Sequence, residues 1–411
     1  ENIEAVEVAD VTDTARMRMF NKGRKVVDLA REFIDSAGAK HYAEAMIGEV
    51  ENRDPFAREV VGATFAERFE ENLRDNNVVS QRGLIEMFDS TIGRSTVLMP
   101  FGGRTQGSET QVSVQKLPTD GYTDTASIMA SGYNPYLASW SPYHGAAYAV
   151  VEAAAKVVAA GARYDRMRYS YQEYFERMTR DPRSWGKPLG ALLGALKMQA
   201  EPAEVPVELG LPSIGGKDSM SGTFQHINVP PMLMAFGITT VNAGTVISTD
   251  FKKAGNRIYL VRHTPRENHM PDTAQLKDNF GFVSENIERG NILAAWSVGF
   301  GGVAEGLAKM AFGNRIGAEV EMDEAELFGY AYGSILVESA VELTHPAAGL
   351  LGMTAAEGAL TVNGVKMPLD ALYKANTEKF AAVYPDKGEN HAGVMTSEPA
   401  PRTFAYRGEA V

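Results

Sequence analysis

A short stretch from Leu211 to Ser221 brings together the residue types that bind phosphate, in the order Leu-Pro-Ser-Ile-Gly-Gly-Lys-Asp-Ser-Met-Ser. Gly215 and Gly216 would let backbone N–H groups approach an anion without obstruction by side chains. Lys217 adds a positive charge, and Asp218 could hold a magnesium ion that bridges phosphate oxygens. The stretch therefore predicts a site for a phosphorylated ligand.

The spacing of this stretch differs from that of a Walker A loop. In that loop the lysine is followed by serine or threonine, whereas Lys217 is followed by Asp218. A different nucleotide-binding geometry is therefore implied. On composition alone, a Gly-Gly-Lys-Asp run is more often an ordinary turn, so both interpretations stay open at this point.

The elements on either side would position this stretch within an α/β unit. Apolar and alternating runs predict strands, and an alanine-rich run and a leucine-rich run predict helices. We expect strands at 96–99, 111–114 and 231–240 and helices at 145–160 and 189–200.

The pattern restarts after Asp250 with a strand expected at 257–262, which opens a further unit. In this unit a strand at 292–298 leads through Gly299-Phe-Gly-Gly302 into a helix at 303–312. Such a turn could hold an anion at the helix N-terminus. Its glycines more often allow close packing of strand and helix.

The upstream region differs from both units. Residues 16–29 indicate a β-hairpin around Asn21-Lys-Gly23. Asp54 and Pro55 predict the N-cap and first residue of a helix with an apolar face. We expect 1–75 to be the tail of a preceding domain followed by a linker helix.

Composition excludes several classes of function. The 411 residues are 44% apolar and carry a net charge of -12, which opposes binding to nucleic acid or to an anionic membrane. The chain has no cysteine, which excludes disulfides and thiolate metal sites within it and favours a cytoplasmic origin. No apolar stretch reaches the ~18–20 residues of a membrane span. The first residues, Glu1-Asn-Ile, indicate an excised piece of a longer protein.

Several segments together resemble the synthetase part of phosphoribosylformylglycinamidine synthase, large form, and with it the aminoimidazole ribonucleotide synthetase superfamily. These segments are 80–93, 97–103, 125–129, 140–145, 171–175 and 214–221. The resemblance implies an α+β architecture and covers nearly the whole chain. Residues 76–248 and 249–395 would be the two synthetase domains of a second repeat, and 396–411 a linker toward a glutaminase domain.

The resemblance also implies an activity. ATP would phosphorylate the formamide oxygen of formylglycinamide ribonucleotide, and ammonia from glutamine would then displace phosphate to give the amidine. An amide oxygen leaves poorly until it is phosphorylated, so catalysis is mainly positioning and charge neutralisation. By resemblance, Gly216, Lys217 and Ser219 match the stretch that lines ATP and substrate, and Gln172 matches another position on the nucleotide side. ATP and Mg²⁺ are the implied cofactors, and Asp218 as metal ligand is a chemical inference.

Two parts of the family's machinery do not occur in this sequence. The catalytic histidine of the family lies in a Ser-Glu-His-Cys stretch, and its glutaminase requires a cysteine; neither is present here. We therefore expect no catalytic residue and no activity in this chain alone. Its partners would be the substrate, the first synthetase half and the glutaminase domain, with no nucleic acid and no membrane.

The alternative is a half that mainly scaffolds the pseudo-dimer and has little nucleotide affinity of its own. Lys217 distinguishes the two hypotheses. If Lys217 and Asp218 line an open cleft beside Gly216, the arrangement would support nucleotide binding, whereas use of this pair in an internal salt bridge would support the scaffold.

Some large members of the family hold magnesium and ADP at an auxiliary site through Asp, Glu, Asn and Asp. The matching positions here are Thr110, Glu152, Lys156 and Ser297. A lysine ammonium ~4 Å from a cation costs about 4 kcal/mol per unit charge at an effective dielectric constant of 20. One hypothesis is therefore that Lys156 replaces the metal ion or that the auxiliary nucleotide is lost. Alternatively, Glu152 and Lys156 form an ordinary surface pair worth ~0.2–0.5 kcal/mol.

Overall fold

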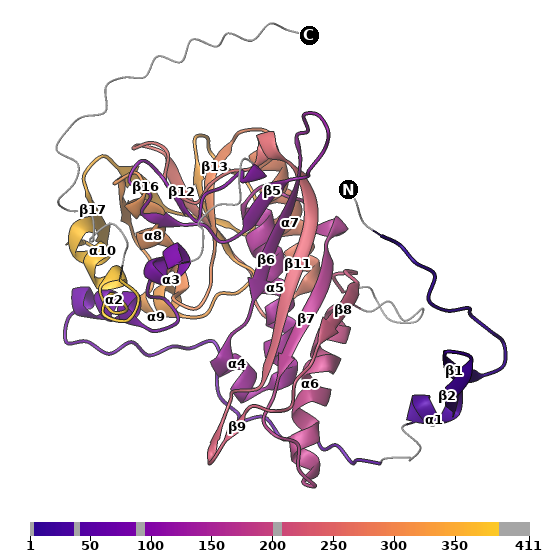
Figure 1. Cartoon of the computed structure of the whole chain (residues 1–411). Helices are drawn as coiled ribbons and strands as arrows, with labels where there is room; N and C mark the ends of the chain where they lie inside the picture. Colours follow the sequence, from indigo (N-terminus) through magenta and orange to yellow (C-terminus); the bar gives the residue numbers. More distant parts are fainter. Residues whose placement is uncertain (1–3, 37–41, 88–94, 200–207, 386–411) are drawn as a thin grey trace, which may run out of the picture.

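The computed structural model of the chain describes residues 4–36, 42–87, 95–199 and 208–385. Two sheets form its body, one of five strands within 113–242 and one of seven strands within 257–368 (Figure 1). Helices lie beside both sheets, which confirms the α+β class. Within the described ranges, no helix is both long and apolar enough to cross a bilayer.

The five-stranded sheet has the order β5-β6-β11-β7-β8. Its strands pair antiparallel except at one edge, where β7 and β8 run parallel. Burial alternates along β6 and β7, so one face of the sheet is turned to the core. The bounds are β5 Ser113–Lys116, β6 Thr125–Gly132, β7 Arg168–Tyr174, β8 Ser213–Lys217 and β11 Met232–Asn242.

Two long helices lie on the core-facing side of this sheet (Figure 1). Helix α5, Pro142–Ala159, begins after the N-cap Ser141 and is buried on nearly all sides, because it also packs against the second unit. It ends before Gly161, whose φ of 101° suits a residue without a Cβ atom. Helix α6, Pro182–Gln199, packs against the outside of α5.

The seven-stranded sheet has the order β13-β15-β12-β16-β14-β17-β18. Its core includes Trp296, Leu336, Met310 and Phe312, all nearly inaccessible to solvent. The strands are β12 Arg257–Val261, β13 Ile292–Ser297, β14 Gly317–Val320, β15 Ile335–Ser339, β16 Ala348–Ala355, β17 Ala359–Val362 and β18 Val365–Pro368. The helices are α7 Thr273–Glu288, α8 Gly302–Phe312, α9 Glu324–Phe328 and α10 Leu369–Thr377.

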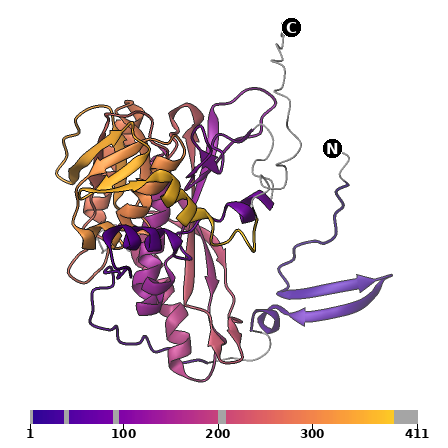
Figure 2. The ribbon, with the colours of Figure 1, turned by 90° about the vertical axis from the view of Figure 1, so that its left-hand side faces the viewer.

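An N-terminal hairpin and helix stand apart from both sheets (Figures 1 and 2). They consist of β1 Arg16–Asn21, β2 Arg24–Ala30 and α1 Arg31–Ser36, which confirms the hairpin predicted there. The remaining short elements are α2 Phe65–Arg74, α3 Arg82–Met87, α4 Pro135–Trp140, β3 Phe101–Gly102, β4 Ser108–Glu109, β9 Thr223–Phe224 and β10 Ile227–Asn228, with two 3₁₀ turns, Tyr164–Arg166 and Ala243–Thr245.

The linker helix begins later than predicted. Helix α2 starts after Thr64, whose hydroxyl accepts the N–H of Glu67 while the Glu67 carboxylate accepts the N–H of Thr64. This capping box satisfies the free N–H groups at the start of the helix, a role that was expected of Asp54. Asp54 instead accepts the N–H of Phe56, and the chain from there crosses to the second unit, where Tyr330 N–H donates to Phe56 O.

Two strand predictions near the first edge were also inaccurate. At 96–99 the structure has only an isolated bridge between Thr96 and Gln115. The strand expected at 111–114 is β5, which begins two residues later. Gln111 lies outside the ladder, and its side chain bonds both backbone groups of Ser297, at 2.8 and 2.9 Å.

Other expectations about elements agree with the structure. The strands expected at 231–240, 257–262 and 292–298 and the helices at 145–160 and 303–312 form with shifts of a few residues. Helix α6 begins at Pro182, seven residues before the predicted start, because proline fits the first turn of a helix. The linker expected at 396–411 lies outside the described residues.

Candidate functional site

The predicted phosphate-binding stretch forms the edge strand of the five-stranded sheet. In the parallel pairing of β7 and β8, Lys217 lies opposite Gln172 and Gly216 opposite Tyr171. The structure therefore brings Gln172, 45 positions upstream, beside the stretch. A sheet edge presents unpaired backbone groups, and together with one lysine these could bind a phosphate.

The two glycines of the stretch meet different surroundings. A Cβ atom on Gly216 would lie 2.6 Å from Tyr171 O, which is too close, whereas one on Gly215 would meet nothing within 4 Å. Close approach of the two backbones therefore requires glycine at position 216 only. Gly215 is not required by packing.

Lys217 meets neither of the conditions set by the two hypotheses. Every residue of β8 is exposed, and the side chain of Lys217 makes no hydrogen bond or ion pair with any residue that the structure describes. It is therefore not used in an internal salt bridge. It stands on an open sheet edge rather than in a cleft.

Ser219 and Asp218 continue the edge around the end of β7. Ser219 N–H donates to Glu173 O, Phe175 N–H donates to Ser219 O, and the hydroxyls of Ser219 and Ser221 are 2.9 Å apart. These bonds fix the turn that carries Asp218. Among the described residues, no group of three or more His, Cys, Asp or Glu side chains could enclose a metal ion.

Glu173 is the site residue that sequence reasoning missed. It is 8% exposed, and its Oε1 atom has no hydrogen-bond partner among the described residues. Burial, together with the neighbouring Asp218 carboxylate, raises the pKa of Glu173 to about 7. The signal was present in the strand, because Tyr169, Tyr171 and Glu173 alternate onto the buried face.

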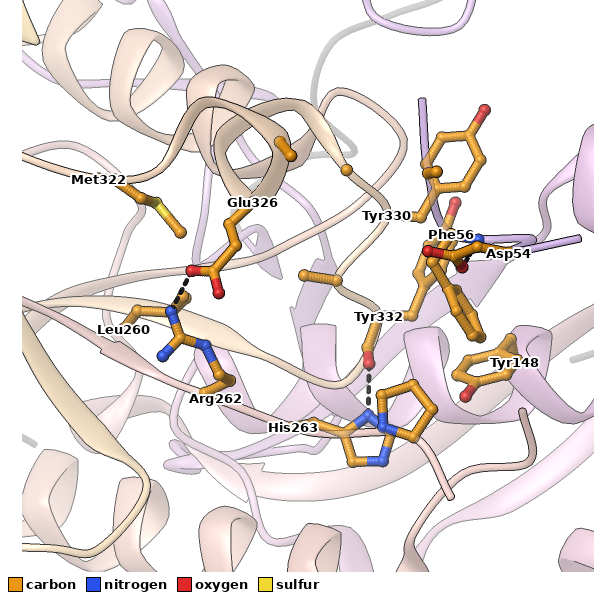
Figure 3. Close-up of a pocket in the computed structure, with 15 residues that line it drawn as sticks. Asp54, Phe56, Tyr148, Leu260, Arg262, His263, Met322, Glu326, Tyr330 and Tyr332 are labelled. Atoms are coloured by element: carbon orange, nitrogen blue, oxygen red, sulfur yellow. Dashed lines mark hydrogen bonds and ion pairs between the residues drawn. The ribbon is translucent and has the colours of Figure 1, made fainter. Parts of the chain in front are cut away.

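A cavity of about 350 Å³ lies away from this sheet edge, between the segment at 54–57 and the unit that contains the seven-stranded sheet (Figure 3). Phe56, Tyr148, Tyr330 and Tyr332 gather at one side. At the other side Arg262 forms an ion pair of 2.6 Å with Glu326.

His263 lines this cavity, and its imidazole ring is neutral. Its Nδ1 atom lies 2.8 Å from Tyr332 O, the contact that a dashed line marks in Figure 3, and its Nε2 atom accepts the N–H of Asp272. Burial lowers the pKa of His263 to about 4. Tyr148 and Tyr332 hydroxyls also bond within the protein, so these three side chains are committed to holding the structure together.

His144 is likewise bonded within the protein. Its Nδ1 atom lies 2.8 Å from the Ser141 hydroxyl, and its Nε2 atom lies 3.0 Å from Asn268 O. Burial lowers the pKa of His144, which favours the neutral ring.

The four positions matched to the auxiliary site lie where the two units meet. Thr110 donates its hydroxyl to Met99 O, and the hydroxyl of Ser297 is buried without a partner among the described residues. Glu152 and Lys156 form an ion pair of 2.8 Å with side chains only 8% and 18% exposed. The pair is thus buried rather than on the surface.

Comparison with known proteins gives a consistent answer. No family model matches the chain. Among curated proteins, the chain is 24% identical over 346 residues to the PurL subunit of phosphoribosylformylglycinamidine synthase from Thermoplasma acidophilum, covering 78% of this chain and 42% of the relative. It is 26% identical over 373 residues to that of Nitratiruptor, covering 82% and 46%.

Solved structures share the fold. T. maritima PurL complexed with ATP aligns with a TM-score of 0.56 and 18% identity, covering 83% of this chain and 49% of that one. The PurLQS structure from Thermotoga maritima aligns with a TM-score of 0.55 and 18% identity, covering 84% and 49%. The chain is similar to PurL. It spans about half the length of the PurL proteins it matches, and the expected fold is confirmed.

Proposed function

We propose that the chain is one half of the synthetase of a phosphoribosylformylglycinamidine synthase. In this reaction ATP activates the formamide oxygen of formylglycinamide ribonucleotide, and ammonia from glutamine replaces it. The observation that carries the proposal is the β7–β8 edge, where Gln172, Gly216 and Lys217 lie together and Lys217 has no partner among the described residues. T. maritima PurL structures complexed with ATP and with FGAR support it.

The chemistry of the edge suits phosphate rather than a neutral ligand. The Lys217 ammonium is an uncommitted positive charge, and Ser219 and Ser221 add hydroxyls at the adjoining turn. Mg²⁺ usually binds through one or two carboxylates plus phosphate oxygens, and Asp218 beside Glu173 offers such carboxylates. Bound there, Mg²⁺ would neutralise charge on the phosphate groups.

The N-terminal hairpin supports the proposal that a further synthetase half is the partner. The unit β1-β2-α1 has the same form as β17-β18-α10 at the edge of the seven-stranded sheet. Both hairpins turn through two residues of positive φ, Lys22 at 48° and Gly23 at 77° in the first and Asn363 at 51° and Gly364 at 76° in the second. Such pairs are typical of type I′ hairpins.

The two hairpin units, β1-β2-α1 and β17-β18-α10, differ in their surroundings. In the C-terminal hairpin unit, β17 pairs in parallel with β14, and Leu360 is fully buried. Met19, equally distant from its own turn, is 50% exposed. As far as the structure describes the chain, the hydrogen bonds and ion pairs of the N-terminal hairpin unit all lie within residues 4–36. We infer that it docks on the edge of another domain of the same kind.

Binding of ATP tests the proposal. We expect calorimetric titration to detect saturable, magnesium-dependent binding to the chain and at least a tenfold loss of affinity in Lys217→Ala, because a charge-assisted contact to phosphate is removed. Lys374→Ala is the matched control, since Lys374 is exposed and lies on α10. Equal affinity in Lys217→Ala would contradict the proposed role of the edge.

The scaffold alternative makes a different prediction for the same titration. It expects no binding to the unmodified chain. In either case we expect no amidine formation by the chain alone, because the histidine and the cysteine that the resemblance requires are not in its sequence.

A further inference from the structure

Carboxylates from both units converge where the two units meet. Glu152 on α5 and Glu305 on α8 line a cavity of about 290 Å³ that also includes Gln111 and Tyr133. A Cβ atom on Gly299 would lie 3.7 Å from Glu152 Oε1 and 3.9 Å from Glu305 Oε2. Both carboxylates are buried and lie beside the same glycine, so each requires a positive charge nearby.

The positive charge for Glu152 comes from Lys156. Its Nζ atom lies 2.8 Å from Glu152 Oε1 and also donates to Ser131 O at 2.8 Å. The second carboxylate oxygen, Oε2, accepts the N–H of Tyr133 at 2.9 Å. Both oxygens of Glu152 are thus engaged, and Lys156 joins α5 to the end of β6.

The positive charge for Glu305 comes from Lys309. Its Nζ atom lies 2.9 Å from Glu305 Oε1 and 2.7 Å from Glu109 Oε2. Burial favours the neutral amine, but the two carboxylates outweigh it and raise the pKa of Lys309, so the side chain is charged. Glu305 Oε2 accepts the N–H of Gly301.

These contacts do not fit the magnesium nucleotide that some relatives are expected to hold at this place. Every carboxylate oxygen of Glu152 and Glu305 already has a partner, and one oxygen of each is paired with a lysine ammonium. A divalent cation against Glu152 would have to approach the ammonium of Lys156, which repels it.

We propose that Lys156 is a built-in cation that replaces a divalent metal ion at the junction of the two units, so that the junction needs no metal. Lysine brings its charge with the chain, whereas a metal ion must be bound from solution. The proposal concerns the junction alone and does not depend on the activity proposed for the sheet edge.

Substitutions at position 156 can convert one kind of junction into the other. Lys156→Asn removes the ammonium and supplies an oxygen ligand, whereas Lys156→Met keeps the length of the side chain without charge or oxygen. Manganese alone, followed by electron paramagnetic resonance, is the probe. We expect Lys156→Asn to gain one saturable Mn²⁺ site relative to the unmodified chain, and Lys156→Met to gain none. The double variant Glu152→Gln/Lys156→Asn should lose the gained site.

Thermal unfolding gives an independent measurement. The unmodified chain should have the same Tm in Mg²⁺ and in EDTA. Both single variants should unfold about 5–10 °C lower in EDTA, because a buried charge loses its partner, and only Lys156→Asn should recover with Mg²⁺. A Mn²⁺ site in the unmodified chain that Glu152→Gln removes would overturn the proposal, and this comparison does not require the Lys156 variants to fold. Equal Mn²⁺ binding by the Asn and Met variants would also overturn it.

Discussion

At the scale of single residues, burial decides which charges remain available. Lys217 and Lys156 are both lysines, yet one is exposed without a partner among the described residues and the other is held by Glu152 and Ser131. The first can attract a ligand, and the second stabilises the fold. Glu173 is a third case, since it is buried without full compensation.

The raised pKa of Glu173 makes stability depend on pH. The folded chain retains the proton up to about pH 7, whereas the unfolded chain releases it near 4.5. Folding therefore binds a proton between these values, and the contribution of Glu173 to stability falls as pH rises through this window. We expect Glu173→Gln to remove this slope and to raise the free energy of unfolding at pH 8 by up to about 3 kcal/mol.

Chemical denaturation at pH 4.5, 6 and 8 would measure this change. Glu319→Gln is a suitable control, because Glu319 is exposed on β14. The same slope in Glu173→Gln as in the unmodified chain would show that another group is responsible.

At the scale of elements, the pairing of β8 with β7 depends on one glycine. Because a Cβ atom at position 216 would collide with Tyr171 O, Gly216→Ala should displace β8 from β7. We expect a loss of stability of about 1–3 kcal/mol and weaker ATP binding in the same variant. Gly215→Ala, where a Cβ atom meets open space, should change both by little. Thermal unfolding and calorimetry of the two variants test this, and equal behaviour would contradict the parallel pairing.

At the scale of the whole molecule, the two hairpin units predict opposite effects of deletion. Removal of residues 1–36 should change the free energy of unfolding by less than about 0.5 kcal/mol. The N-terminal hairpin unit β1-β2-α1 has no hydrogen bond or ion pair to the rest of the described chain. Removal of 359–377 deletes the buried side chains of Leu360, Val362 and Leu372, which exposes the core that they cover and should prevent folding. Circular dichroism with thermal unfolding distinguishes the two, and a destabilised first deletion would mean that the hairpin already packs on the body.

Elements with strong short-range signals follow directly from the local sequence. The turn at Lys22-Gly23, the apolar strand before Asn242 and the alanine-rich helix before Gly161 follow from periodicity and from the freedom of glycine, so they could be predicted. The residues of the candidate edge were also identifiable, because they lie within one stretch. The burial of Glu173 could also be predicted, because Tyr169, Tyr171 and Glu173 occupy alternate positions of β7 and therefore face the same side of the sheet.

The meeting of residues that are far apart in the chain depends on the three-dimensional fold. Gln172 lies beside Lys217 because two distant strands pair, and Gln111 bonds Ser297 from the other unit. Burial of the Glu152 and Lys156 pair depends on the packing of one unit against the other. A sequence pattern records the neighbours of a residue along the chain, whereas burial and charge compensation depend on neighbours in space.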